Sequence, residues 1–163
     1  MNCVYLKSGF SNRIEALFNE MVRRNNTYKL AEKENRRSEV YSPQYYVITG
    51  IQSIYADLAE DTKDKFNTLL EKAELHFHIR FILCSTTKEL AEFAGTNWYK
   101  RHVTGSDGIW VGNGISDQYI LKLGRLTNAL YSEILPPFGY TVKRGKATLV
   151  KLIVGEHSEE DAE

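Results

Sequence analysis

The feature that most constrains the fold is a mostly apolar run of strand length at residues 77–84, Phe-His-Ile-Arg-Phe-Ile-Leu-Cys. Such a run is typical of a parallel strand that is covered on both faces. Two more short β-rich runs occur, at residues 45–50 and 109–112, and helical patterns separate the three. Strands that alternate with helices predict an α/β fold whose parallel strands are joined by right-handed crossovers.

Helical periodicity begins at the N-terminal end of the chain. Apolar residues recur at three- and four-residue spacing over residues 10–22, and Asn12 with Glu15 forms a candidate capping box there. The charged stretch 23–37 is expected to be a solvated helix end or a connector. Periodicity returns over residues 51–58 and resumes at residues 66–73, after the polar interruption 60–62.

Two further helix starts are predicted from capping residues. Thr86 with Glu89 matches a capping box, and Ser116 with Asp117 indicates a cap for a short helix over residues 119–123. The C-terminal part reads as a β-hairpin whose strands, residues 140–142 and 147–153, flank a turn at Arg144 and Gly145.

A chain of 163 residues and 18.7 kDa suits one compact domain. We therefore expect a single domain over residues 1–153, followed by an acidic, disordered tail over residues 154–163. The formal net charge is zero, with 21 basic and 21 acidic residues, so the composition gives no general sign of nucleic-acid binding. No stretch approaches the roughly 20 apolar residues that cross a bilayer, and no signal peptide is recognised, so we expect a cytoplasmic protein without membrane contact of its own.

Two glycines, Gly139 and Gly145, resemble the frame of a phosphate-binding loop. Five residues separate them instead of four, and Ala147 follows the lysine where a hydroxyl is required, so the segment is predicted to be the hairpin. His76 and His78 could face one side of a strand, but no nearby ligands complete a metal site, and we expect no metal ion.

The densest cluster of aromatic and basic residues spans residues 98–102. Trp98, Tyr99 and Arg101 are candidates for docking a partner, and the two aromatics could equally cover a core edge.

Three segments together resemble the FtsK/SpoIIIE superfamily of P-loop motor domains, and within it the last ATPase-like domain of the EssC-type coupling proteins of type VII secretion. They are Tyr-Val-Ile-Thr-Gly-Ile-Gln-Ser-Ile-Tyr-Ala-Asp-Leu at 46–58, residues 77–87, and residues 108–118 with Pro-Pro-Phe-Gly-Tyr-Thr-Val-Lys-Arg-Gly at 136–145. The resemblance covers roughly residues 10–153. It implies a three-layer P-loop NTPase-like core, mostly parallel, with a C-terminal β-hairpin.

The departures from this family concern its nucleotide chemistry. The phosphate loop and the first strand are missing or degenerate, and Thr49 and Gly50 stand where the family carries the acidic pair that holds magnesium. The family would use Mg-ATP, whereas for this chain we expect no cofactor and no catalytic residue. Thr49, Gly50, Thr86 and Thr87 are predicted to form the remnant of the pocket, because parallel sheets place ligands at the carboxyl ends of their strands.

The function implied by the resemblance is that of a pseudo-ATPase module at the C-terminal end of a type VII secretion motor protein, on the cytosolic face of the membrane. Its expected partners are secreted substrates or neighbouring subunits. The alternative is an FtsK/SpoIIIE-type ATPase fragment that contributes to a nucleotide site or to DNA translocation together with other chains or domains.

Overall fold

The structure is a computed structural model that describes residues 8–74, 77–103, 105 and 107–153. By its internal contacts the chain divides into two compact units, Met1–Arg101 and His102–Glu163, and the single domain over residues 1–153 stays a prediction. The predicted tail, residues 154–163, lies outside the described residues. No helix in the described part of the chain is both long enough and apolar enough to span a membrane.

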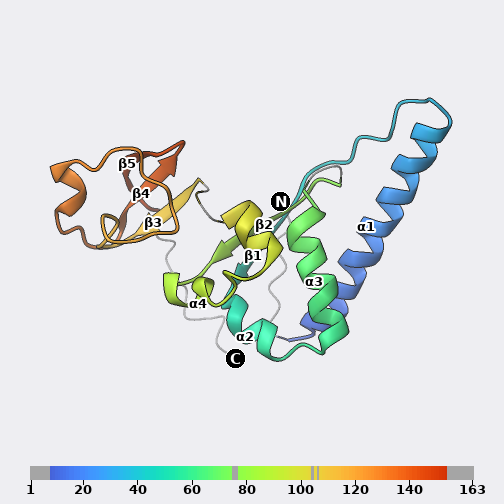
Figure 1. The fold of residues 1–163 in the computed structure, drawn as a ribbon, viewed down its shortest axis with the longest axis horizontal. Coiled ribbons are helices and arrows are strands. Elements are labelled where there is room, and N and C mark those ends of the chain that lie inside the picture. The colour runs from blue at the N-terminus through green and yellow to red at the C-terminus, as the bar shows by residue number, and fades with distance from the viewer. Residues whose placement is uncertain (1–7, 75–76, 104, 106, 154–163) are drawn as a thin grey trace. The chain divides into compact units, whose positions relative to one another are not determined.

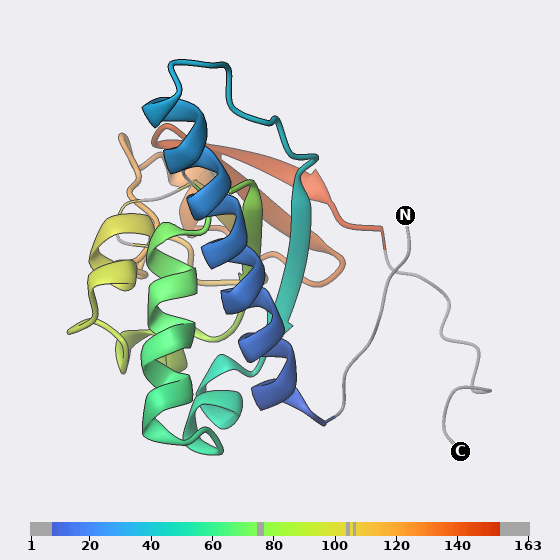
Figure 2. The ribbon, with the colours of Figure 1, turned by 90° about the vertical axis from the view of Figure 1, so that its right-hand side faces the viewer.

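The N-terminal unit combines four helices with a two-stranded parallel sheet (Figure 1). Strands β1 and β2 pair in register from Gln44 with Ile79 to Thr49 with Cys84, which confirms the predicted parallel pair. Helices α1 and α3 lie side by side in both views (Figures 1 and 2). The elements of this unit are α1 (Phe10–Lys33), β1 (Gln44–Thr49), α2 (Ile51–Ala56), α3 (Glu60–Lys72), β2 (Ile79–Cys84) and α4 (Thr87–Ala91).

Only one face of this parallel sheet is covered. Ile79 is fully buried, whereas Tyr45, Val47 and Ile82 on the opposite face are 47%, 61% and 50% exposed. Successive strand residues point to opposite faces, so the exposed side chains form one continuous open face. The expectation that both faces of the apolar run would be covered is therefore wrong for the described residues.

The C-terminal unit is built on an antiparallel sheet with the order β3-β4-β5. Its elements are β3 (Gly108–Val111), the 3-10 helix η2 (Asn128–Tyr131), β4 (Phe138–Lys143) and β5 (Lys146–Lys151), and the π-helix η1 (Tyr99–Val103) precedes them across the junction of the units. The hairpin is confirmed: Lys143 pairs with Lys146, and the turn residues Arg144 and Gly145 have φ values of 50° and 78°. The hydrophobic core of the C-terminal unit contains a buried cluster of Ile115, Leu130, Tyr140 and Val142.

Strand β3 corrects the prediction of a mostly parallel sheet. It pairs with β4, antiparallel, in a sheet separate from β1 and β2. The pairing depends on Gly139, because a Cβ at that position would lie 2.4 Å from the carbonyl oxygen of Trp110. The fold is thus mixed α/β with one small parallel and one antiparallel sheet, and a P-loop core remains a prediction.

Two predicted helix starts are also corrected. Helix α1 begins after Gly9, and Asn12 lies inside it without capping it, while the Glu15 carboxylate accepts a hydrogen bond from Lys65 at 2.6 Å. No helix forms over residues 119–123, where the Gln118 side-chain oxygen accepts hydrogen bonds from the backbone N–H groups of Ile120 and Leu121 at 2.8 and 2.7 Å. A side chain that takes these donors offers the backbone an alternative to helical hydrogen bonds.

Candidate functional site

The predicted remnant pocket lies at the carboxyl edge of the parallel sheet. Thr49 ends β1 opposite Cys84, and Gly50 follows with φ 63° as the residue that begins α2. Thr86 and Thr87 follow β2 and begin α4. The parallel register therefore brings the four predicted residues to one edge of the sheet.

The start of α4 is closed by its own side chains. Thr86 Oγ1 accepts a hydrogen bond from the Glu89 backbone N–H at 3.2 Å, and Glu89 Oε2 accepts from the Thr86 N–H at 3.1 Å, which confirms the predicted capping box. Glu89 Oε2 also accepts from Ser85 Oγ at 2.5 Å. The Ser85 hydroxyl and the Thr86 backbone N–H therefore donate to a carboxylate, and these two donors do not face an anionic ligand.

The charge of Glu89 reinforces this effect. Hydrogen bonding from Ser85, and then from the Thr86 backbone, lowers the pKa of Glu89 below its ordinary value, so the side chain is ionised at neutral pH. A second carboxylate, that of Glu92, accepts two hydrogen bonds from Gln52 Nε2 at 2.6 and 2.7 Å and links α4 to α2. Lys88 is the one basic residue of segments 49–52 and 84–92, and its side chain is exposed.

No carboxylate stands at the end of β1, where the family carries its acidic pair. Thr49 and Gly50 occupy the end of β1, and the described residues contain no cluster of three or more His, Cys, Asp or Glu side chains able to hold a metal ion. His78 is among the described residues and His76 is not. Chemically, the edge can anchor helices and present carboxylates, but its described side chains do not form a phosphate cradle.

The aromatic docking candidates belong to the core in this structure. Trp98 is 2% and Tyr99 6% exposed, and Trp98 Nε1 donates a hydrogen bond to Asn67 Oδ1 at 3.0 Å. The indole also packs against the Phe93 ring with centroids 5.3 Å apart. Because their side chains are desolvated within the unit, we reassign both aromatics from the predicted docking surface to the core.

Arg101 is placed differently from the two aromatics. Its guanidinium pairs with the Glu71 carboxylate at 3.1 Å and its side chain remains 54% exposed. Because this ion pair is exposed on the Arg101 side, it contributes little to stability.

Two features escaped the sequence reasoning. The capping box was predicted, but the sequence analysis did not anticipate that the Glu89 carboxylate would accept hydrogen bonds from Ser85 and Thr86 within the predicted remnant pocket. The acidic residue in the first turn of the helix is the signal that could have indicated this. The hairpin was recognised, but not the concentration of Lys143, Arg144 and Lys146 around its turn, which is visible as three cations within four residues.

Comparison with known proteins finds a similarity among solved structures. No family model matches the sequence, and no curated protein matches it. Among solved structures, the chain is similar to the cytoplasmic domain of EssC, with a TM-score of 0.68 and 20% sequence identity. The match covers 91% of this chain and 29% of that chain, so this chain spans less than a third of its length. At this identity the similarity shows a shared fold.

Proposed function

We propose that this chain is a non-catalytic, cytoplasmic module of a type VII secretion motor protein, which keeps the ATPase-like fold and has lost nucleotide chemistry. The similarity to the cytoplasmic domain of EssC supports the place in type VII secretion. The observation that carries the loss of nucleotide binding is the occupied edge of the sheet, where Glu89 accepts the hydrogen bonds of Ser85 and Thr86.

Phosphoryl transfer depends on positioned donors and on cations that neutralise the developing charge. At this edge an ionised Glu89 would repel a phosphate, and no carboxylate follows β1 to hold magnesium. Both effects oppose Mg-ATP binding.

The proposed role of the module is to dock secreted substrates or neighbouring subunits. The open face of the parallel sheet supports this role, since Tyr45, Val47 and Ile82 expose apolar surface there. Parallel sheets are normally covered on both faces, so a neighbouring domain or subunit would complete the layer.

The nucleotide part is tested by calorimetric titration of the full chain with Mg-ATP. We expect no heat of binding at tens of micromolar protein. A dissociation constant below about 10 μM, equivalent to roughly −7 kcal/mol, would contradict the proposal.

The docking part is tested by a photo-crosslinking amino acid placed at Ile82 in cells that produce the secretion system. We expect an adduct with a secreted substrate or with another part of the motor protein, identified by mass spectrometry. The same probe at Lys29, exposed on α1, is the matched control. Equal adducts from both positions, or none from Ile82, would argue against docking on the open face.

A further inference from the structure

Strand β5 forms an open edge of the antiparallel sheet. The order β3-β4-β5 gives β5 a single neighbour, β4, among the described strands. Lys143 and Lys146 face each other across the two-residue turn as a hydrogen-bonded pair, and such pairs alternate along the strand from there. Ala147, Leu149 and Lys151 therefore direct their backbone N–H and C=O groups away from β4. These outward groups can pair with an additional strand.

Leu149 shows that the core side of the sheet is incomplete at this edge. It pairs with Tyr140, which is 5% exposed and belongs to the buried cluster of the C-terminal unit. Residues directly opposite each other in a strand pair lie on the same face, so Leu149 also points to the core side. Its side chain nevertheless remains 53% exposed. An added strand with an apolar residue beside Leu149 would bury this surface.

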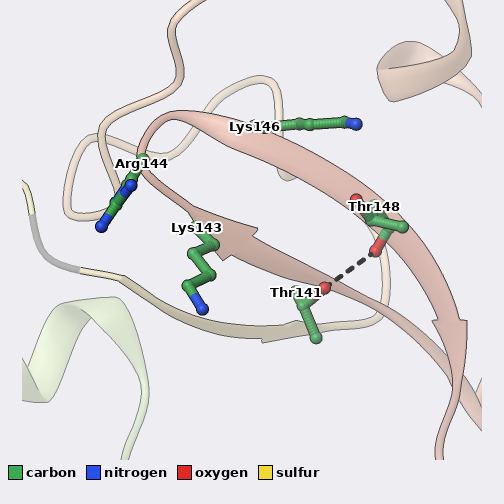
Figure 3. A pocket seen from close by; sticks show the side chains of 5 residues that line it. All are labelled: Thr141, Lys143, Arg144, Lys146 and Thr148. Carbon is green, nitrogen blue, oxygen red and sulfur yellow. Dashed lines mark hydrogen bonds between the residues drawn. The ribbon is translucent and has the colours of Figure 1, made fainter.

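The charge along this edge is positive. Lys146 and Lys151 are the two end residues of β5, and both are exposed. No carboxylate of the described residues forms an ion pair with either lysine. The Asp107 carboxylate, near the turn, accepts a hydrogen bond from the Arg144 backbone N–H at 2.6 Å. A hollow on one face of the hairpin is lined by polar and basic side chains, Thr141, Lys143, Arg144, Lys146 and Thr148 (Figure 3).

These lysines select the kind of strand that the edge accepts. Like charges that face each other across a strand pair destabilise it, whereas opposite charges stabilise it. A second copy of β5 in antiparallel pairing would bring its own Lys146 and Lys151 against those already present, so self-association is opposed. A strand with an acidic residue at each end would form two favourable pairs instead. The edge therefore favours a partner of opposite charge over another copy of this chain.

Nucleic acid fits this edge less well than an acidic peptide. Its phosphates would attract the lysines, but its backbone has no N–H groups for the outward carbonyls of β5 and no apolar side chain to cover Leu149. An extended peptide supplies backbone donors, backbone acceptors and side chains together.

We propose that β5 binds an extended acidic segment of a partner protein as an added antiparallel strand. Such a segment carries acidic residues opposite Lys146 and Lys151 and an apolar residue opposite Leu149. Backbone hydrogen bonds along the edge supply affinity, and the alternating side chains supply specificity. The inference does not rest on the proposed function, because it uses only the charge and sheet geometry of the C-terminal unit.

The test uses the synthetic peptide Glu-Thr-Val-Thr-Val-Glu-Asp. In antiparallel pairing it places a glutamate opposite Lys151 and Lys146 and a valine opposite Leu149. NMR of the isotope-labelled full chain follows binding and amide hydrogen exchange at about 50 mM salt. We expect a dissociation constant below about 1 mM and roughly tenfold slower exchange of the outward amides of Ala147, Leu149 and Lys151.

Two altered peptides separate strand addition from simple charge attraction. N-methylation of the valine opposite Leu149 removes a backbone donor at the edge and leaves the charge unchanged, so we expect it to abolish the protection. The basic counterpart Lys-Thr-Val-Thr-Val-Lys-Lys should not bind, because its lysines would face Lys146 and Lys151.

Variants of the chain test the charge selection. Lys146→Glu with Lys151→Glu should weaken the acidic peptide roughly tenfold and admit the basic one, because both cross-strand pairs reverse their sign. Lys146→Gln with Lys151→Gln should weaken it less, and it provides the test if the glutamate variant does not fold. Lys29→Glu with Lys33→Glu, both exposed on α1, makes the same change in net charge and should leave binding intact.

Several results would overturn the proposal. They are the absence of peptide binding at about 1 mM, equal protection by the N-methylated peptide, and equal weakening by the α1 variant. A duplex oligonucleotide that protects the outward amides of β5 better than the acidic peptide would also overturn it.

Discussion

At the scale of single residues, a densely connected polar group surrounds Glu20 on α1. Its carboxylate accepts hydrogen bonds from Arg23 Nε and Nη2 at 2.7 and 2.8 Å and from Arg24 Nε at 2.7 Å. Arg24 is 4% exposed; it also donates to the Phe77 carbonyl and lies 4.5 Å from the centroid of the Tyr41 ring. These contacts satisfy a buried guanidinium and explain how the polar half of α1 stays helical.

The Glu20 cluster predicts acid sensitivity. Hydrogen bonds from Arg23, assisted by Arg24 and opposed by burial, lower the pKa of Glu20 from 4.5 to about 2. A carboxyl whose pKa is lower in the folded state stabilises the fold above its unfolded pKa, and the contribution is lost as pH falls through the folded pKa. Urea unfolding should therefore show stability declining between pH 4.5 and 2, with a weaker decline in Glu20→Gln. Identical slopes for both proteins would show that the cluster does not couple to folding.

Ile79 and Phe81 point to the same face of β2 but differ in burial. Ile79 is completely buried, whereas Phe81 is half-buried, with its ring centroid 5.8 Å from that of Tyr46. We expect Ile79→Ala to lower the free energy of unfolding by about 2–5 kcal/mol, because it leaves a cavity. Phe81→Ala should cost less, since part of the ring already contacts solvent. Chemical denaturation of both variants measures the order, and the reverse order would place Phe81 in the core.

At the scale of elements, the register of β3 on β4 depends on one residue without a side chain. At Gly139, the closest atom to an added Cβ is the Trp110 oxygen, which belongs to the backbone and cannot rotate away. Overlap with backbone forces the strands apart, whereas overlap with a flexible side chain can be relieved. The antiparallel sheet of the C-terminal unit is thus specified as much by this close approach as by its apolar residues.

Gly139→Ala should therefore destabilise the protein by about 1–3 kcal/mol or more, as expected for overpacking. Gly95→Ala is the matched control, because a Cβ there has no heavy atom within 4 Å. Thermal unfolding followed by circular dichroism compares the two. A midpoint for Gly139→Ala equal to that of Gly95→Ala would mean that the two strands do not approach this closely.

At the scale of the whole molecule, the division into two units leaves each sheet small. A two-stranded parallel sheet has one face to pack against its own helices, and in the N-terminal unit the other face remains exposed at Val47 and Ile82. This exposure is the structural basis for proposing that a neighbouring domain or subunit packs there.

The open face of the parallel sheet should tolerate polar substitutions with little loss of stability. Val47→Ser with Ile82→Ser should change the free energy of unfolding of the isolated chain by no more than about 1 kcal/mol, because both side chains are already half exposed or more. The same change at a covered strand would cost several times as much. Equilibrium urea unfolding provides the measurement. A large loss of stability would mean that the face is covered in the isolated chain.

The sequence by itself determined the local elements. Periodicity located β1 and β2, the Thr86–Glu89 pattern located the start of α4, and the glycine of the hairpin turn matched its positive φ. Each of these depends on interactions within a few residues, so the pattern carries the necessary information. The predicted site residues at the ends of β1 and β2 were also brought to one edge, because parallel pairing aligns strand ends.

The tertiary structure alone decided which partners those elements take. Only it showed that β3 pairs antiparallel with β4, that one face of the parallel sheet is open and that Trp98 is buried against Asn67 and Phe93. It also replaced a predicted helix with a loop held by Gln118. An apolar or aromatic residue has the same local signature whether it faces a core or a partner. The choice depends on long-range packing, which local periodicity does not encode.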